Sequence, residues 1–252
     1  MYFRKVLFFM LMLPVGFVSG QVSIKDSSIL VPMVYGFYGY QSPAGDMADR
    51  FGGNSAVGPG VQFKLKSGFM FGMEYNFLWG NRVKNADQIL SNLLTADGQV
   101  ISMEGTYALF DLFERGYTVT GHVGKLFPVL SPNPNSGFFV KVGAGYMQHW
   151  IRAQVKDVSV PWLDGDYEKG YDRLSAGFMV NEFVGYMYLS NTRLLNFYVG
   201  LEFIQAWTRS QREVNFDSGM KDDAARFDAL NGFKIGWIIP IYKRTPEEFY
   251  YY

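Results

Sequence analysis

Residues 69–80 read FMFGMEYNFLWG, and this stretch decides the fold class. Its large apolar side chains occupy every second position: Phe69, Phe71, Met73, Tyr75, Phe77 and Trp79. Gly72, Glu74 and Asn76 lie between them. Because successive side chains of a β-strand point to opposite faces, this period of two predicts a strand with one continuous apolar face and one mixed polar face.

The same alternation recurs along the chain. It is clear in five further segments, residues 56–66, 115–127, 137–152, 195–207 and 229–242. Two more segments, residues 30–41 and 176–190, have strand-like composition but are harder to phase. In the second, Asn181 and Glu182 are adjacent, so one of them faces the apolar side unless a β-bulge intervenes. The sequence therefore predicts eight strands.

The links between these strands alternate in length. Short links with turn residues cover 66–68, 130–136 and 190–194, and long links cover 42–55, 81–114, 153–174 and 208–228. Within the second long link, residues 85–94 (NADQILSNLL) suit a short helix. Short turns at one end and long loops at the other are typical of a closed antiparallel up-and-down transmembrane β-barrel with both chain ends on the short-turn side.

The first twenty residues predict a secretory signal peptide. Arg4 and Lys5 precede an apolar stretch that ends near Phe17, and Val18-Ser19-Gly20 offers small residues for cleavage. An uncleaved anchor is the alternative, but the apolar stretch is shorter than the roughly 20 residues of a spanning helix. We expect residues 1–20 to be removed and residues 21–252 to form one outer-membrane β-barrel domain. No later run of 18 apolar residues predicts a transmembrane helix.

The apolar strand faces favour lipid over a protein core. Each phased segment has 11 or more residues, near the roughly 10 needed to cross a bilayer at a tilt. Aromatic side chains such as Trp79, Trp150 and Trp207 lie toward strand ends, where an interfacial girdle belongs. The opposite faces mix glycine with isolated charges, which suits a narrow barrel interior. A secreted soluble sandwich or lipocalin-like barrel remains the alternative.

At this point the chain resembles the small OmpA- and OmpX-type outer-membrane barrels. The resemblance covers residues 30–242 and rests on topology. OmpA proteins carry a periplasmic peptidoglycan-binding domain after the barrel, and we expect that domain to be lacking here, because the chain ends at KRTPEEFYYY. The resemblance also implies that the aromatic end is read by the outer-membrane assembly machinery. Signal, aromatic content and long loops are similar to those of barrels from Bacteroidota.

The inward faces predict a polar network that plugs the lumen. Its members are Gln62, Lys64, Glu74, Asn76, His122, Lys141, His149, Glu202 and Lys234. Opposite charges enclosed in a narrow interior are expected to pair, because an unpaired buried charge is costly. We interpret the set as a structural filling of an eight-stranded barrel, with a narrow ion path or gate as the alternative.

The sequence indicates no catalytic, cofactor or metal site. Enzymes on this architecture need a nucleophile and a base, and the chain has two histidines, His122 and His149. A deacylase-like His-x-Ser is absent, because Gly124 and Ile151 stand two residues after them. The acidic residues 164–168 lack the spacing of a calcium loop and suit a solvated loop. Without cysteine, disulfides and thiolate metal sites are excluded.

Three functions remain open from the sequence. The first is a structural or interaction protein, as an accessory subunit of an outer-membrane secretion or transport assembly, because loops and tail carry aromatic residues. The second is a narrow channel for small solutes, and the third is a lipid A-modifying enzyme. The expected partners are outer-membrane lipid, lipopolysaccharide and other outer-membrane or periplasmic proteins. With 23 basic and 23 acidic residues the net charge is zero, so nothing predicts nucleic-acid binding.

Overall fold

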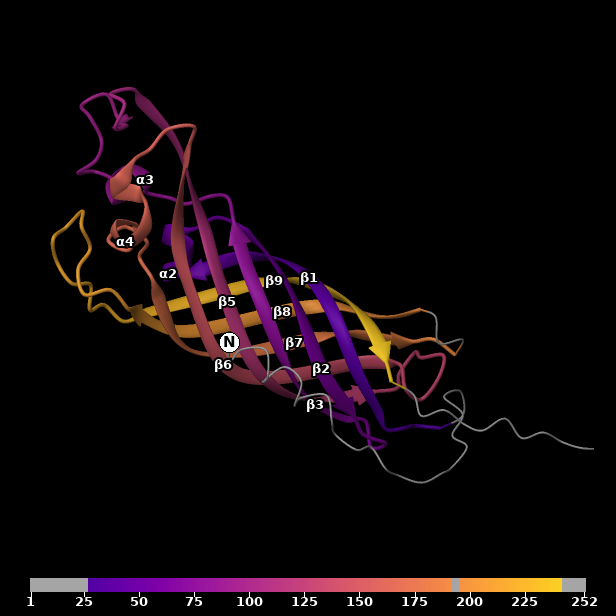
Figure 1. Ribbon diagram of the computed structural model, residues 1–252. Helices are drawn as coiled ribbons and strands as arrows, with labels where there is room; N and C mark the ends of the chain where they lie inside the picture. Colours follow the sequence, from indigo (N-terminus) through magenta and orange to yellow (C-terminus); the bar gives the residue numbers. More distant parts are fainter. Residues whose placement is uncertain (1–26, 192–194, 242–252) are drawn as a thin grey trace, which may run out of the picture.

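The chain forms a closed antiparallel barrel, as the computed structural model of residues 27–191 and 195–241 shows (Figure 1). The barrel strands are β1 (Val31–Gly45), β2 (Asn54–Lys64), β3 (Phe69–Gly80), β5 (Tyr107–Phe127), β6 (Gly137–Lys156), β7 (Ser175–Leu189), β8 (Asn196–Ser210) and β9 (Arg226–Pro240). A ninth strand, β4 (Val100–Ile101), pairs with β5 outside the barrel. The predicted signal peptide and the aromatic C-terminal residues lie outside the described residues.

Closure comes from the two pairings that join the ends of the strand order. β1 pairs with β9 as well as β2, and β3 pairs with β5 as well as β2. Each of the eight long strands therefore has two neighbours, so the barrel wall has no open edge. Where β5 and β6 extend past Glu114 and His149, they leave their partners β3 and β7 and pair with each other. The predicted up-and-down barrel of eight strands is confirmed.

Two predicted strands are too short. β5 begins at Tyr107 rather than residue 115, and β6 continues to Lys156 rather than residue 152. The extra residues still pair, with Leu109 opposite Lys156, and Lys156 forms an ion pair of 2.6 Å with Asp111. The alternation that predicts these two strands covers only residues 115–127 and 137–152, whereas the backbone ladder continues beyond it. The other predicted strand ends agree within four residues.

The prediction of which alternate residues point outward from the strands, and which point inward, is correct. Phe71, Val140 and Ile235 point outward and are 46%, 43% and 46% exposed. The inward residues between them are buried along every barrel strand. In β7 the register passes through Asn181 and Glu182 without a bulge, so Asn181 points inward and Glu182 points outward.

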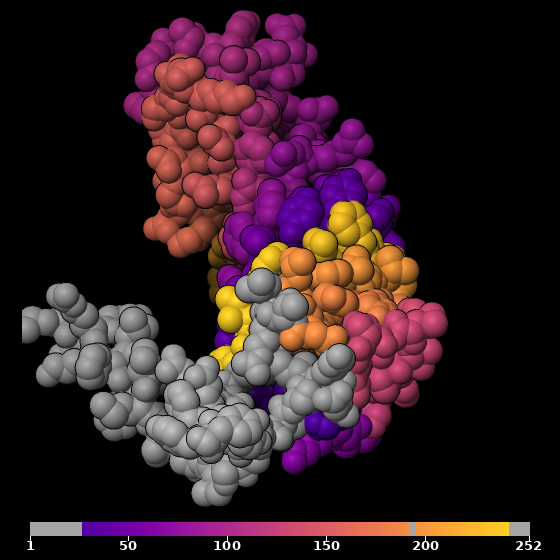
Figure 2. Space-filling model, turned by 90° about the vertical axis from the view of Figure 1, so that its right-hand side faces the viewer, coloured from indigo at the N-terminus to yellow at the C-terminus, as the bar shows by residue number. Residues whose placement is uncertain are grey.

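The long links lie together at one end of the barrel. They contain α2 (Asp46–Arg50), α3 (Ala86–Ile89), η1 (Pro161–Leu163) and α4 (Gly165–Glu168), and α3 falls inside the short helix expected at residues 85–94. Among the described residues, no helix has both the length and the apolar character needed to cross a membrane. The extended β5–β6 pair and its loops stand above the rest of the barrel (Figures 1 and 2).

Apolar side chains fill much of the interior, which the sequence analysis did not predict. Near the short turns, Tyr35, Phe139, Phe183 and Tyr198 are at most 2% exposed. The rings of Phe139 and Phe183 lie 4.9 Å apart, and both contact Tyr198 edge to face. Near the long loops, Met47 and Phe51 from the α2 segment join a second buried apolar cluster. The lumen thus holds a buried apolar cluster toward each end.

Inward glycines make room for the large rings. A Cβ placed on Gly236 would lie 2.2 Å from the Tyr198 ring, and one on Gly60 would lie 2.2 Å from the Tyr35 ring. Both positions face the interior. The barrel is narrow enough that a tyrosine on one strand requires a residue without a side chain on its neighbour.

We predict that Gly236→Ala destabilises the barrel by about 1–3 kcal/mol, because the Tyr198 ring must move in a packed interior. The matched control is Gly36→Ala, at an outward position where a Cβ meets nothing within 4 Å. Urea unfolding of the two variants in lipid vesicles measures the difference. Equal midpoints for Gly236→Ala and Gly36→Ala would contradict the packing argument.

Candidate functional site

Four buried charges from four strands meet in the middle of the lumen. Lys141 Nζ on β6 lies 2.9 Å from Glu74 Oε2 on β3, and Lys234 Nζ on β9 lies 2.6 Å from Glu202 Oε1 on β8. Lys234 also pairs with the second oxygen of Glu74. All four side chains are at most 5% exposed. Two ammonium groups and two carboxylates give this charged layer no net charge.

Neutral side chains complete the charged layer. The Tyr35 hydroxyl donates to Glu74 Oε2 at 3.0 Å, and the amides of Asn181 and Gln41 donate to Glu202 at 3.3 and 3.4 Å. Sequence reasoning missed these three residues. Tyr35 and Gln41 lie on the segment 30–41, which is harder to phase, and the adjacent polar residues Asn181 and Glu182 leave open which of the two faces inward.

The remaining predicted lumen residues are buried but do not join the charged layer. Lys64 lies near the short turns, where its ammonium donates to Asn135 Oδ1 at 2.8 Å and to Ser28 Oγ at 3.1 Å. Gln62 approaches the Met70 sulfur at 3.9 Å. Asn76 Oδ1 and His122 Nε2 have no hydrogen-bond partner within the described part of the chain.

His149 belongs to a second network at the mouth near the long loops. Its Nε2 lies 3.0 Å from Asp228 Oδ2, and Asp228 also accepts from Thr208 at 2.5 Å. Arg50, at the end of α2, donates to the other Asp228 oxygen at 2.8 Å and to Ser175 Oγ at 3.3 Å. Arg50 therefore ties the first long loop to β7 and β9. Arg50 and Asp228 fall in the predicted long links 42–55 and 208–228, whereas the structure places Asp228 on β9.

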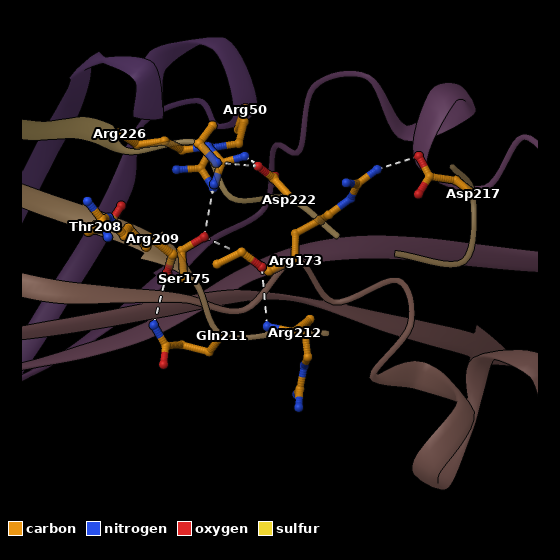
Figure 3. A network of polar contacts seen from close by, with 12 residues as sticks. Arg50, Arg173, Ser175, Thr208, Arg209, Gln211, Arg212, Asp217, Asp222 and Arg226 are labelled. Atoms are coloured by element: carbon orange, nitrogen blue, oxygen red, sulfur yellow. Dashed lines mark hydrogen bonds and ion pairs between the residues drawn. The ribbon is translucent and has the colours of Figure 1, made fainter. Parts of the chain in front are cut away.

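A pocket of about 150 Å³ lies beside Arg50, and both polar residues and the apolar Ile89 and Ile151 line it. Figure 3 shows three arginines of this region, Arg50, Arg173 and Arg226, each directed toward neighbouring polar side chains. Arg226 pairs with Asp222, and Arg173 pairs with Asp217. Because each of these arginines already has a carboxylate partner, the pocket offers no strong site for an anion.

The ion pairs of this region hold the long loops in place. Burial acts to raise the pKa of Asp222, but hydrogen bonds from Arg226 and from the backbone N–H of Ala224, together with the positive charges of Arg226 and Arg173, lower it by more, so the pKa lies below its usual range. Arg212 donates to Asp172 through Nε at 2.9 Å, and this contact joins the fourth long loop to the third. These contacts connect the long loops to one another, so the loops form a folded cover.

The acidic residues 164–168 are engaged within their own loop. Asp164 accepts from the backbone N–H of Gly165 at 2.8 Å, and Asp166 pairs with Lys169 at 2.5 Å. Glu168 accepts from the backbone of Ala153 at 3.2 Å. Across residues 27–191 and 195–241, no three His, Cys, Asp or Glu side chains cluster as metal ligands.

The histidines are enclosed by protein. His149 is fully buried and held by Asp228, and His122 is 5% exposed. General acid–base work requires the ring to reach a substrate proton. The geometry of His149 suits hydrogen bonding inside the barrel, and that of His122 suits packing there.

No family model matches the chain, and no curated protein matches it. Among solved structures the chain is similar to Ail, the attachment invasion locus protein of Yersinia pestis, in complex with the heparin analogue sucrose octasulfate. That match has 9% identity and a TM-score of 0.41, and covers 83% of this chain and 99% of Ail. Neisserial surface protein A matches at 12% identity, with 81% and 95% covered and a TM-score of 0.38.

The N-terminal β-barrel domain of Pseudomonas aeruginosa OprF matches at 10% identity, with 82% and 96% covered and a TM-score of 0.34. At such identities a likeness concerns the fold, and the assignment depends on this chain's own geometry. Its strands close, its apolar side chains face outward and its interior is filled. The protein is an eight-stranded outer-membrane β-barrel.

We predict that Glu74→Leu destabilises the barrel by about 3–5 kcal/mol, because it leaves Lys141 without its carboxylate and Lys234 with one. The double variant Glu74→Leu/Lys141→Met keeps the Lys234–Glu202 pair and is expected to be less destabilised than the single one. Urea unfolding in vesicles compares the two. A single variant with wild-type stability and a raised single-channel conductance would instead identify a gate.

Proposed function

We propose that this barrel is a structural or interaction protein that acts as an accessory subunit of a larger outer-membrane assembly. The observation that carries the proposal is the projection formed by β5, β6 and β4, with its exposed apolar tip. Four tip side chains stand out: Ile101, Met103, Tyr107 and Leu109, which are 51%, 73%, 62% and 68% exposed. Exposed apolar side chains grouped on a folded element are typical of a protein-binding surface.

The tip is supported by ordered contacts. The backbone N–H of Met103 donates to Ser159 at 3.0 Å, and Ser102 and Thr106 share a hydrogen bond of 2.9 Å. The Met103–Ser159 bond ties the second long loop to the third, and the Ser102–Thr106 bond closes a turn within the second. A rigid surface binds at a lower entropic cost than a flexible loop, which supports a role in recognition.

The filled lumen favours interaction over transport. Apolar clusters lie on both sides of the neutral charged layer formed by Glu74, Lys141, Glu202 and Lys234. A conducting path needs a continuous hydrated route, and these packed layers oppose one. The proposal includes no catalytic step. Its partners are other outer-membrane or periplasmic proteins, with lipid and lipopolysaccharide around the barrel.

We predict that the protein purifies from native outer membranes in mild detergent as part of a complex larger than a single chain, whose mass before processing is 28.7 kDa. Replacing Tyr107 and Leu109 with serine is expected to weaken the complex roughly tenfold, because apolar anchors contribute most of the binding energy. Leu130→Ser, at an 84% exposed position on a short turn, is the control. Native mass and co-purified protein are the readouts.

A solitary monomer in mild detergent would contradict the proposal. Steady conductance of the wild-type protein in planar bilayers would favour the channel instead. Altered lipid A on mass spectrometry after overexpression would favour an enzyme.

A further inference from the structure

One carboxylate points away from the barrel in the middle of its apolar face. Glu182 on β7 is exposed, with Val180 and Val184 as the next outward residues on its own strand. Its cross-strand neighbours are Val142 on β6 and Phe203 on β8. A carboxylate on the lipid-facing side of a barrel is disfavoured, most of all near the bilayer centre.

Glu182 lies midway between the aromatic ends of the apolar band. Phe178, four residues toward the long loops, stacks on Trp207 with centroids 6.1 Å apart. Tyr186, four residues toward the short turns, contacts the Phe138 ring at 5.4 Å. Four residues of strand span about 13 Å, so neither aromatic end brings Glu182 to the interface.

No cation compensates this charge. Glu182 makes no hydrogen bond or ion pair with any residue in the described ranges 27–191 and 195–241. The outward residues of β7, β8 and β9 within the band include no lysine or arginine. Ionisable side chains at membrane depth usually mark a functional contact with a polar partner.

Two amides share this face. Asn231 on β9 lies directly opposite Phe203, on the side away from Glu182, and Gln205 is the next outward residue on β8. Phe203 therefore has polar neighbours on three sides. We call these four residues, Glu182, Phe203, Gln205 and Asn231, the Phe203 patch. Direct neighbours across strands lie about 5 Å apart, so the patch is compact.

A surface hollow adjoins the Phe203 patch on the side nearer the long loops. It has a volume of about 570 Å³, and Trp207, Phe227 and Arg209 are among its lining residues. Trp207 is the next outward residue after Gln205. A polar group inside the apolar band and a hollow directly above it lie on the same strands, β7, β8 and β9.

We propose that the Phe203 patch is the docking surface for a second outer-membrane protein, which presents a lysine or arginine to Glu182 and hydrogen-bonding groups to Gln205 and Asn231. This inference rests on the proposed function and adds the face and the chemistry of contact. An aromatic residue surrounded by polar groups is a common arrangement at the centre of an interface.

The charge of the patch argues against a second copy as its occupant. In a two-fold dimer the same face meets itself, and Glu182 would approach acidic and amide groups only. A basic residue from a different protein removes the cost of the carboxylate and fixes the register of the two barrels.

The chain has no cysteine, so single cysteines place a cross-linker at chosen sites. Gln205→Cys carries a benzophenone-maleimide on the patch, and Met73→Cys carries it on β3, four strands away in either direction. Met73 is outward and 58% exposed, which matches the chemistry of an ordinary lipid-facing site. Both proteins are irradiated in native outer membranes after export and assembly.

We expect one discrete adduct with a single other protein from position 205 and none from position 73. Adding Glu182→Gln is expected to lower the yield at position 205 roughly tenfold or more, since a buried charge loses its counter-ion. Glu182→Lys is expected to abolish the adduct. Replacing the mapped basic residue of the captured protein with glutamate is expected to restore it.

Folding is checked separately. Isolated Glu182→Gln and Glu182→Leu barrels in vesicles are expected to unfold at the same or a higher urea concentration than wild type, because a lipid-facing carboxylate has been removed. A lower midpoint would show that Glu182 serves the barrel itself and would overturn the proposal. So would no adduct at position 205, an adduct of twice the chain mass, or a yield that Glu182→Gln leaves unchanged.

The two proposals fail in different ways. A complex in mild detergent that depends on Tyr107 and Leu109, with no adduct at position 205, would keep the interaction role and reject the Phe203 patch. A solitary monomer in detergent, together with no adduct, would reject both.

Discussion

The structure depends on the rule that backbone polar groups in hydrocarbon must pair with one another. The β1–β9 and β3–β5 ladders meet that rule by closing the sheet. Closure with eight strands makes the interior narrow, so residues between the outward apolar positions must fit a confined space. Gly60 beside Tyr35 and Gly236 beside Tyr198 are direct consequences of that confinement.

The same confinement explains where the charges lie. Lys141 and Lys234 are enclosed with Glu74 and Glu202 in a neutral layer, because an unpaired ammonium in this interior would destabilise the fold. Buried charge is also paired at the mouth near the long loops, where the Asp228 carboxylate is hydrogen-bonded to Arg50, His149 and Thr208. Glu182 is the contrast, since its carboxylate faces outward without a counter-ion among the described residues.

The outward phase was predictable because a strict period of two runs through segments such as residues 69–80. Tyr198 falls on the inward side of the phased segment 195–207, between Asn196 and Gly200, but nothing local in the sequence shows that its ring packs against Phe139 and Phe183. Residues 107–114 are predicted as part of a long link, because the clear alternation begins only at residue 115. The backbone ladder nevertheless begins at Tyr107. The Arg50–Asp228 pair joins residues 178 positions apart, which local pattern cannot reveal. The alternation predicted which charged side chains are buried in the lumen, but it could not identify which lysine pairs with which glutamate.

The central claim is that the apolar faces meet lipid. Single cysteines at successive positions from 69 to 80, spin-labelled in bilayers, report access to oxygen and to a water-soluble nickel reagent. The structure predicts a period of two, with odd positions such as Phe71 and Met73 accessible to oxygen and even positions shielded from it. Labels at Val140 and Ile235 are expected to behave like Phe71. Odd positions that are accessible to nickel, or a protein that is soluble without detergent, would contradict the account.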